Sequence, residues 1–274
     1  MKVIPNLFTL LNLFFGCVAV ILILQNGVMA LGNSDGSGQQ LIVVPERAAL
    51  ASIFIGLAAL VDFLDGLVAR LFKATSPLGK ELDSLADVVS FGVAPGMILY
   101  QLLRLSWAGQ ANGLDVSAGW LSPSLLIPCA AAYRLARFNI DNSQQYGFKG
   151  VPTPAAGLLI ASLPLITLYT HSDAVSAVLL NKWVLYGLIV AVSYLMISNL
   201  PLMALKFNDS SLRSNMPKLV LVVLSVVAAI FLRWLAVPVV FVVYIIVSLV
   251  FQNGPEVRRP GVRRPEVRRP EANH

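Results

Sequence analysis

The sequence predicts an all-α integral membrane protein, because of its composition and because of the length of its apolar runs. Of the 274 residues, 57% are hydrophobic and only 12% are charged, whereas soluble domains carry roughly 25% charged and about 45–50% apolar residues. A soluble fold, a disordered chain and a disulfide-stapled secreted module are therefore excluded. Only helices and closed barrels satisfy the backbone within lipid, and the runs lack the alternating period of a barrel. We expect a polytopic helix bundle.

A helix that spans the membrane needs about 20 apolar residues, and we expect such helices at 7–24, 48–72, 84–104, 121–138, 155–170, 183–205, 219–235 and 237–251. The first run is longer than the roughly 7–15 apolar residues of a signal peptide, so we expect a retained helix. The last two runs are short, and little more than Arg233 and Pro238 separates them. They form either a tight hairpin or one interrupted element. We therefore expect a six-helix membrane core over 1–206 and two further C-terminal helices over 207–252.

The net charge of +6 comes largely from lysines and arginines that flank the apolar runs or lie in the C-terminal tail. This placement indicates membrane topology, and we expect no nucleic-acid partner. If the N-terminus lies inside and the chain crosses eight times, the outward cations are only Arg47, Arg104, Lys182 and Arg233. Such an inward excess of lysine and arginine sets the orientation of membrane proteins. Six arginines repeat as Val-Arg-Arg-Pro within 253–274, where the regular prolines forbid a helix and predict a disordered basic tail. The tail is either a solvated end or attracted to anionic lipid headgroups.

Four aspartates lie inside or at the edge of the second and third apolar runs: Asp62, Asp65, Asp83 and Asp87. An ionisable group at such a place costs several kcal/mol unless it is paired or lines a wet cavity, so it indicates a functional site. Helical spacing aligns them with small residues on two stripes, Asp62, Gly66 and Ala69 on one and Gly79, Asp83 and Asp87 on the other. A short connection joins the two helices and makes them antiparallel neighbours.

Four carboxylates at one membrane depth would repel one another unless divalent cations neutralise them. All-oxygen ligation suits Mg²⁺ or Mn²⁺, and two ions bridged by shared aspartates can promote displacement at phosphorus. The small residues Gly66, Ala69 and Gly79 let a phosphate-bearing ligand approach the backbone, although helix packing explains the glycines equally well. Arg70 adds a cation beside the site. A cation transporter is the alternative from a different functional class, but a transporter would spread its acidic residues over several helices.

The segment from Asp62 to Asp87 resembles the signature of the CDP-alcohol phosphotransferase family, DxxDGxxARx8GxxxDxxxD, at every fixed position. Three further stretches resemble the phosphatidylserine synthase branch of that family: Pro5–Thr9 leading into Asn12, Arg134–Asn139 and Gly150–Ala155. The resemblance extends over roughly residues 1–206. It leaves the basic tail uncovered.

The resemblance implies an enzyme that transfers a phosphatidyl group from CDP-diacylglycerol to L-serine and releases CMP. Two Mg²⁺ or Mn²⁺ ions would be held by Asp62, Asp65, Asp83 and Asp87, and Asp87 would also act as general base. The CDP-lipid would be bound by Asp62, Gly66, Ala69, Arg70, Gly79 and Asp83. The resemblance also implies a homodimer among the lipids of the cell (inner) membrane, with its active site facing the cytoplasm.

Two arginines, Arg134 and Arg137, lie three residues apart at a helix end on the cytoplasmic side, so both can point into one pocket. They bind phosphate or the serine carboxylate, or they only anchor the helix at the inner face. Other acceptors, glycerol 3-phosphate or inositol phosphate, are the alternative to serine. Two guanidinium groups suit a carboxylate, which arginine binds bidentately, better than a phosphate dianion. We therefore expect serine to be the acceptor.

Overall fold

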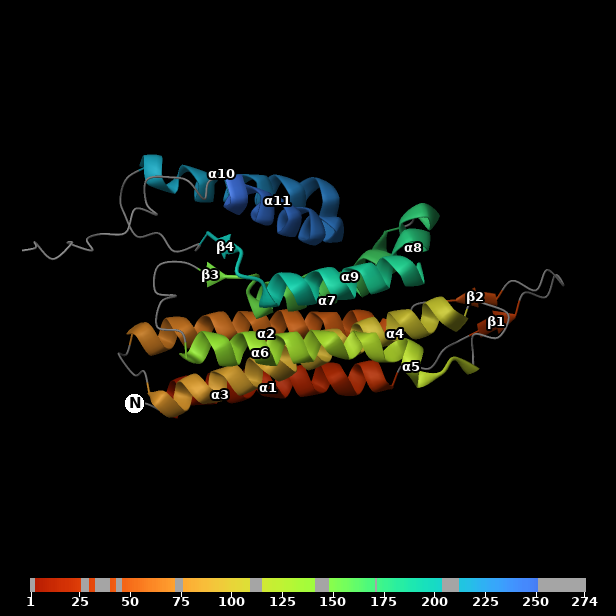
Figure 1. The fold of residues 1–274 in the computed structure, drawn as a ribbon, viewed down its shortest axis with the longest axis horizontal. Coiled ribbons are helices and arrows are strands. Elements are labelled where there is room, and N and C mark those ends of the chain that lie inside the picture. The colour runs from red at the N-terminus through yellow and green to blue at the C-terminus, as the bar shows by residue number, and fades with distance from the viewer. Residues whose placement is uncertain are drawn as a thin grey trace, which may run out of the picture.

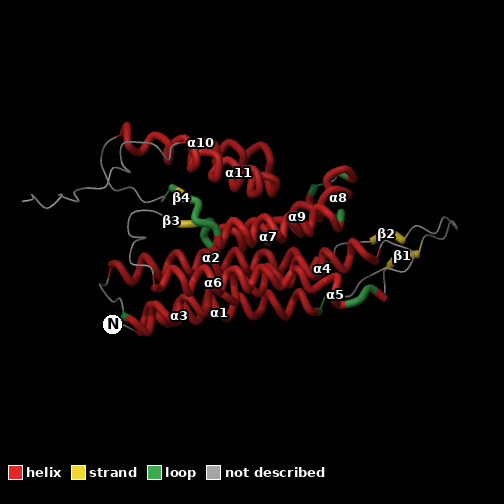
Figure 2. Tube along the Cα trace, in the orientation of Figure 1, coloured by secondary structure: helices red, strands yellow, loops and turns green. Residues whose placement is uncertain are grey.

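A computed structural model describes residues 3–25, 30–32, 40–42, 46–71, 76–108, 115–140, 148–170, 172–203 and 212–250. Most of these residues are helical, which confirms the predicted all-α fold. Figures 1 and 2 show the long helices lying roughly parallel to one another in a bundle. The predicted basic tail over 253–274 lies outside the described residues.

The helices, in chain order, are α1 Val3–Leu24, α2 Glu46–Leu71, α3 Pro77–Val88, α4 Ala94–Ala108, α5 Ala118–Leu121, α6 Leu126–Ile140, α7 Thr153–Tyr169, α8 Asp173–Leu179, α9 Lys182–Ile197, α10 Leu212–Leu232 and α11 Ala236–Val250. Two short antiparallel pairs accompany them, β1 Ala30–Gly32 with β2 Gln40–Ile42 and β3 Phe148–Lys149 with β4 Pro201–Leu202. The β1–β2 pair lies at one end of the bundle, and the β3–β4 pair lies beside the ends of α7 and α9 (Figure 2). Neither contributes to a sheet core.

A helix occupies each of the eight predicted spans, but not all are long. Four helical stretches in the described chain are long and apolar enough to cross a membrane: Pro5–Leu24, Glu46–Val68, Pro77–Ala108 and Leu219–Val250, the last of which contains both α10 and α11. A fifth forms if α8 and α9, bent by 58°, count as one span. Helices α6 and α7 have only 15 and 17 residues. Helix α9 ends at Ile197, earlier than predicted, because the residue before Pro201 is disfavoured in a helix.

The last two apolar runs form a hairpin, which decides between the two arrangements that the sequence leaves open. Helices α10 and α11 pack against each other, and Figure 1 shows them side by side. The chain reverses in a 3₁₀ turn, Arg233–Leu235, where Arg233 has a φ of 49°. Leu224 of α10 and Val243 of α11 consequently line the same apolar pocket.

Helices α3 and α4 form one long element with a π-helical turn, Val89–Val93, between them. Its start is set by Ser76, whose Oγ accepts a hydrogen bond from Gly79 N at 3.0 Å and caps the helix, while Pro77 occupies the first turn. The π turn follows directly after the aspartates of α3. Wide turns of this kind occur frequently at functional sites.

Glycines on neighbouring helices bring the π turn into close contact with the bundle. A methyl group on Gly157 of α7 would lie 2.9 Å from Phe91 Cβ, and one on Gly92 would lie 2.9 Å from Ala131 Cβ of α6. On α1, a methyl group at Gly16 would overlap Ser90. These contacts are closer than side chains tolerate, so the glycines fix the π turn between α1, α6 and α7.

An aromatic cluster lies at the end of the α3–α4 element that is far from Asp83 and Asp87. Trp107 Nε1 donates to Tyr186 Oη at 3.2 Å, Tyr186 Oη donates to the Trp120 carbonyl at 2.7 Å, and Lys182 Nζ lies 3.9 Å from the centre of the Trp107 ring. Tryptophan and tyrosine concentrate at the interfaces of a membrane with water. A helical rise of about 1.5 Å per residue places Trp107 roughly 30 Å along the element from Asp87, which is close to the thickness of the hydrocarbon layer.

Candidate active site

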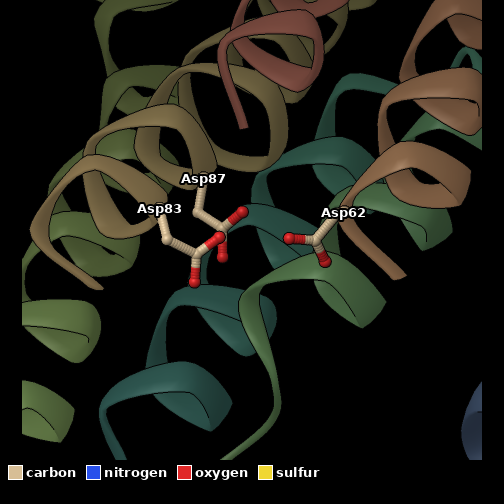
Figure 3. A group of neighbouring side chains, drawn as sticks. All are labelled: Asp62, Asp83 and Asp87. Carbon is tan, nitrogen blue, oxygen red and sulfur yellow. The ribbon is translucent and has the colours of Figure 1, made fainter. Parts of the chain in front are cut away.

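Three aspartates from two helices meet in one cluster. Asp62 comes from α2, and Asp83 and Asp87 come from α3; one carboxylate oxygen of each lies within 4.8 Å of the other two. Figure 3 shows the three side chains pointing toward one another. Asp87 is buried, with 7% of its surface exposed, and Asp62 and Asp83 are half-buried. The four-residue spacing on α3 therefore does place two carboxylates on one face, opposite α2.

The cluster has the properties of a divalent-metal site. Asp83 Oδ1 is buried and has no hydrogen-bond partner among the described residues. An unpaired buried carboxylate oxygen is costly unless a cation or an ordered water accompanies it. Carboxylate oxygens are the ligands that Mg²⁺ and Mn²⁺ prefer, so the residues fit such an ion.

Asp65 is not among the three aspartates whose oxygens meet within 4.8 Å, but it lies close enough to Asp83 and Asp87 to interact with them electrostatically. Its buried carboxylate accepts a hydrogen bond from Thr9 Oγ1 of α1 at 2.9 Å. The same hydroxyl lies 3.2 Å from the Pro5 carbonyl, an alternative acceptor in the first turns of α1. The structure thus brings together three of the four aspartates expected to bind metal and joins the fourth to α1.

Helix α1 also reaches the cluster through Asn12, whose Nδ2 donates to Asp87 Oδ1 at 3.4 Å. Thr9 and Asn12 are three residues apart and thus share one face of α1, from which each donates to a different aspartate. Neither residue was predicted from the sequence to contact the aspartates, although both lie in the stretch that resembles the phosphatidylserine synthase branch. Two polar side chains at helical spacing within an apolar run were the signal that could have identified them.

The small residues of the signature differ in their surroundings. A methyl group on Gly66 would meet no atom within 4 Å, so space remains beside α2 at this point. A methyl group on Gly79 would lie 3.0 Å from Ser76 Oγ and 3.1 Å from Asn6 Oδ1, which makes close packing of α1 and α3 the reason for this glycine. The side chains of Ala69 and Arg70 lie outside the described part of the structure.

The two arginines of α6 have different environments. Arg134 is buried, with 8% exposed; its NH1 donates to Thr153 Oγ1 of α7 at 3.1 Å, and its Nε has no partner among the described residues. Its guanidinium is close enough to Asp87 to interact with it electrostatically. Arg137 instead donates to the Ile197 carbonyl at 3.2 Å and to Asn199 Oδ1, at the end of α9. Arg134 therefore lies within electrostatic reach of Asp87, and Arg137 ties α6 to α9.

The end of α6 is attached to α3 by a second set of polar contacts. Asn139 Nδ2 donates to Ser84 Oγ at 2.9 Å, and Lys80 Nζ donates to the Asn139 carbonyl at 3.1 Å. Ser84 lies between the two aspartates of α3 in the sequence. The contacts consequently fix the helix that carries two of the three clustered carboxylates.

Residues 2–195 match the sequence profile of the CDP-alcohol phosphatidyltransferase family. The match covers more than half of the chain and contains the aspartate cluster, both arginines of α6 and the polar face of α1. The chain belongs to this family.

Several relatives carry the name CDP-diacylglycerol–serine O-phosphatidyltransferase. One from Helicobacter pylori (strain J99) is 34% identical over 198 residues, 72% of this chain and 70% of the relative. One from Mycobacterium tuberculosis (strain H37Rv) is 30% identical over 237 residues, 84% of this chain and 70% of the relative. One from Bacillus subtilis (strain 168) is 32% identical over 169 residues, 60% of this chain and 76% of the relative.

Metal binding by the cluster can be measured directly with Mn²⁺. We expect Asp62→Asn and Asp83→Asn to weaken Mn²⁺ binding at least about tenfold, because even the loss of outer-shell partners acts on that scale. Electron paramagnetic resonance of purified protein titrated with Mn²⁺ reports the affinity. Asp115→Asn is the matched control, since Asp115 is exposed and outside the cluster. Unchanged affinity in both cluster variants would refute the metal site.

Proposed function

We propose that the protein transfers a phosphatidyl group from CDP-diacylglycerol to L-serine, forming phosphatidylserine and releasing CMP. The observation that carries the proposal is the meeting of Asp62, Asp83 and Asp87 across α2 and α3, in a chain of the CDP-alcohol phosphatidyltransferase family. The names of the relatives support serine as the acceptor.

Asp62, Asp83 and Asp87 would hold two Mg²⁺ or Mn²⁺ ions, and the signature supports Asp65 as the fourth ligand. When bound, such ions stabilise the negative charge that develops at a reacting phosphate. The Thr9 hydroxyl would orient Asp65 for this role. The space beside Gly66 suits the nucleotide part of the CDP-lipid, with Ala69, Arg70 and Gly79 nearby on the same two helix ends.

Asp87 would be the general base. It takes the proton of the serine hydroxyl, whose oxygen forms a bond to the phosphorus that carries diacylglycerol. The bond from that phosphorus to the oxygen of CMP breaks, and CMP leaves. Arg134 would bind the serine carboxylate or a substrate phosphate, because its unpaired Nε and its position beside Asp87 offer donors at the reacting centre.

We further propose that the protein is a homodimer in the cell (inner) membrane with its active site toward the cytoplasm. The inward excess of lysine and arginine supports the orientation. The aromatic cluster around Trp107, at the other end of the α3–α4 element, is consistent with the outer interface. The dimer is what the resemblance to the family implies.

The proposed reaction can be tested with purified protein, CDP-diacylglycerol and labelled acceptors. We expect labelled serine to yield phosphatidylserine together with CMP, and excess EDTA to abolish the reaction until Mg²⁺ or Mn²⁺ is restored. Glycerol 3-phosphate, inositol phosphate and ethanolamine are the comparison acceptors, with products identified by chromatography. A dominant glycerol 3-phosphate product would overturn the choice of acceptor, and full activity in chelator would overturn the metal-dependent mechanism.

The two arginines of α6 should respond differently to replacement by lysine, which cannot reproduce bidentate binding. We expect Arg134→Lys to raise the KM for serine, or for the CDP-lipid if Arg134 binds phosphate, by on the order of tenfold. Arg137→Lys, the matched control, should lower thermal stability and leave both KM values nearly unchanged, because Arg137 contacts α9. A larger KM effect for Arg137→Lys would reverse these assignments.

A further inference from the structure

Asn12 is a fully buried amide in the middle of α1, a helix that is otherwise mostly apolar. Its Nδ2 donates to Asp87 Oδ1 at 3.4 Å, whereas its Oδ1 is buried without a hydrogen-bond partner among the described residues. A buried acceptor left unpaired costs about 1–3 kcal/mol. The stability of α1 therefore gives no reason for an amide at position 12. The hydrogen bond from Asn12 to the Asp87 carboxylate does give one.

The π turn supplies a second contact to the same residue. Ser90, fully buried in that turn, donates its hydroxyl to the Asn12 carbonyl at 3.0 Å. Ser90 follows Asp87 by three residues, so one stretch of α3 and the π turn touches Asn12 twice. Gly16, one helical turn after Asn12, leaves room for Ser90 to approach. The side chain and the backbone of Asn12 are thus both held against the element that carries Asp87.

An uncharged donor has an advantage at this position. A lysine or arginine here would pair with the aspartates and compete with a divalent cation for them. An amide N–H can instead orient one carboxylate oxygen while leaving the charge of the carboxylate available. Misplacement of a reacting group by about 1 Å can cost on the order of 10²-fold in rate.

We propose that Asn12 is a positioning residue, which holds the Asp87 carboxylate in the direction needed to accept the proton of the attacking hydroxyl, and that Ser90 acts through Asn12. This inference rests on the proposed function. It extends the reacting centre to α1 and to the π turn, neither of which carries a residue of the aspartate signature.

The test compares steady-state kinetics of Asn12→Leu, Ser90→Ala and the double variant, with CDP-diacylglycerol and serine as substrates. We expect Asn12→Leu to lower kcat about 10- to 100-fold with little change in either KM, and Ser90→Ala to lower kcat about 2- to 10-fold. In the double variant, the serine substitution should have no further effect, because it acts through the lost amide.

Two matched controls separate positioning from folding. Gln101→Leu also removes a buried amide that donates to α1, but at the Ile23 carbonyl near its other end. Ser52→Ala removes a buried hydroxyl bonded to the Ala48 carbonyl within α2. Both controls should keep wild-type kcat.

Additive losses in the double variant, or an effect on KM alone, would overturn the proposal. If Asn12→Leu does not fold, a kcat of Ser90→Ala no lower than that of Ser52→Ala overturns it instead. The proposed function is tested separately, with wild-type protein. If the wild-type protein shows no serine-dependent release of CMP, the proposed function is refuted, whatever the variants show.

Discussion

The convergence of carboxylates inside an apolar bundle is the constraint on which the rest of this structure depends. Asp62, Asp83 and Asp87 repel one another at close range, and burial increases the cost of that repulsion. A divalent cation would remove the cost, and in the proposed reaction the same carboxylates would serve catalysis. The packing around the cluster serves to hold these side chains together from different helices.

Helix α1 contributes most of that support without contributing a carboxylate. On its polar face, Thr9 donates a hydrogen bond to Asp65 and Asn12 donates one to Asp87. Gly16 leaves room for the π turn to pack closely against α1. The other side of the turn is closed by Gly157 and by α6, which carries Arg134 toward the cluster. Small residues and neutral donors can bring these elements close because they add no competing charge.

Much of this arrangement is predictable from the sequence. The spacing of Asp83 and Asp87 predicts their common face, and the short connection to α2 predicts that Asp62 faces them. The hydrogen bond of Asp65 to Thr9 and the different roles of Arg134 and Arg137 were not predictable, because they depend on contacts from α1, α7 and α9. Periodicity along one helix contains no information about which side chain of another helix fills a given position. The reversal at Arg233 likewise requires the packing of α10 on α11.

The role of Asp87 at the centre of the cluster is tested by the turnover of Asp87→Asn, measured alongside binding of CDP-diacylglycerol. Asparagine preserves the shape of the side chain but cannot accept the proton of the serine hydroxyl. Asp87→Asn should therefore lower kcat by on the order of 10² or more, while binding of the CDP-lipid is lost less severely. Turnover near the wild-type rate would contradict the assignment of Asp87 as the base at the centre of the cluster.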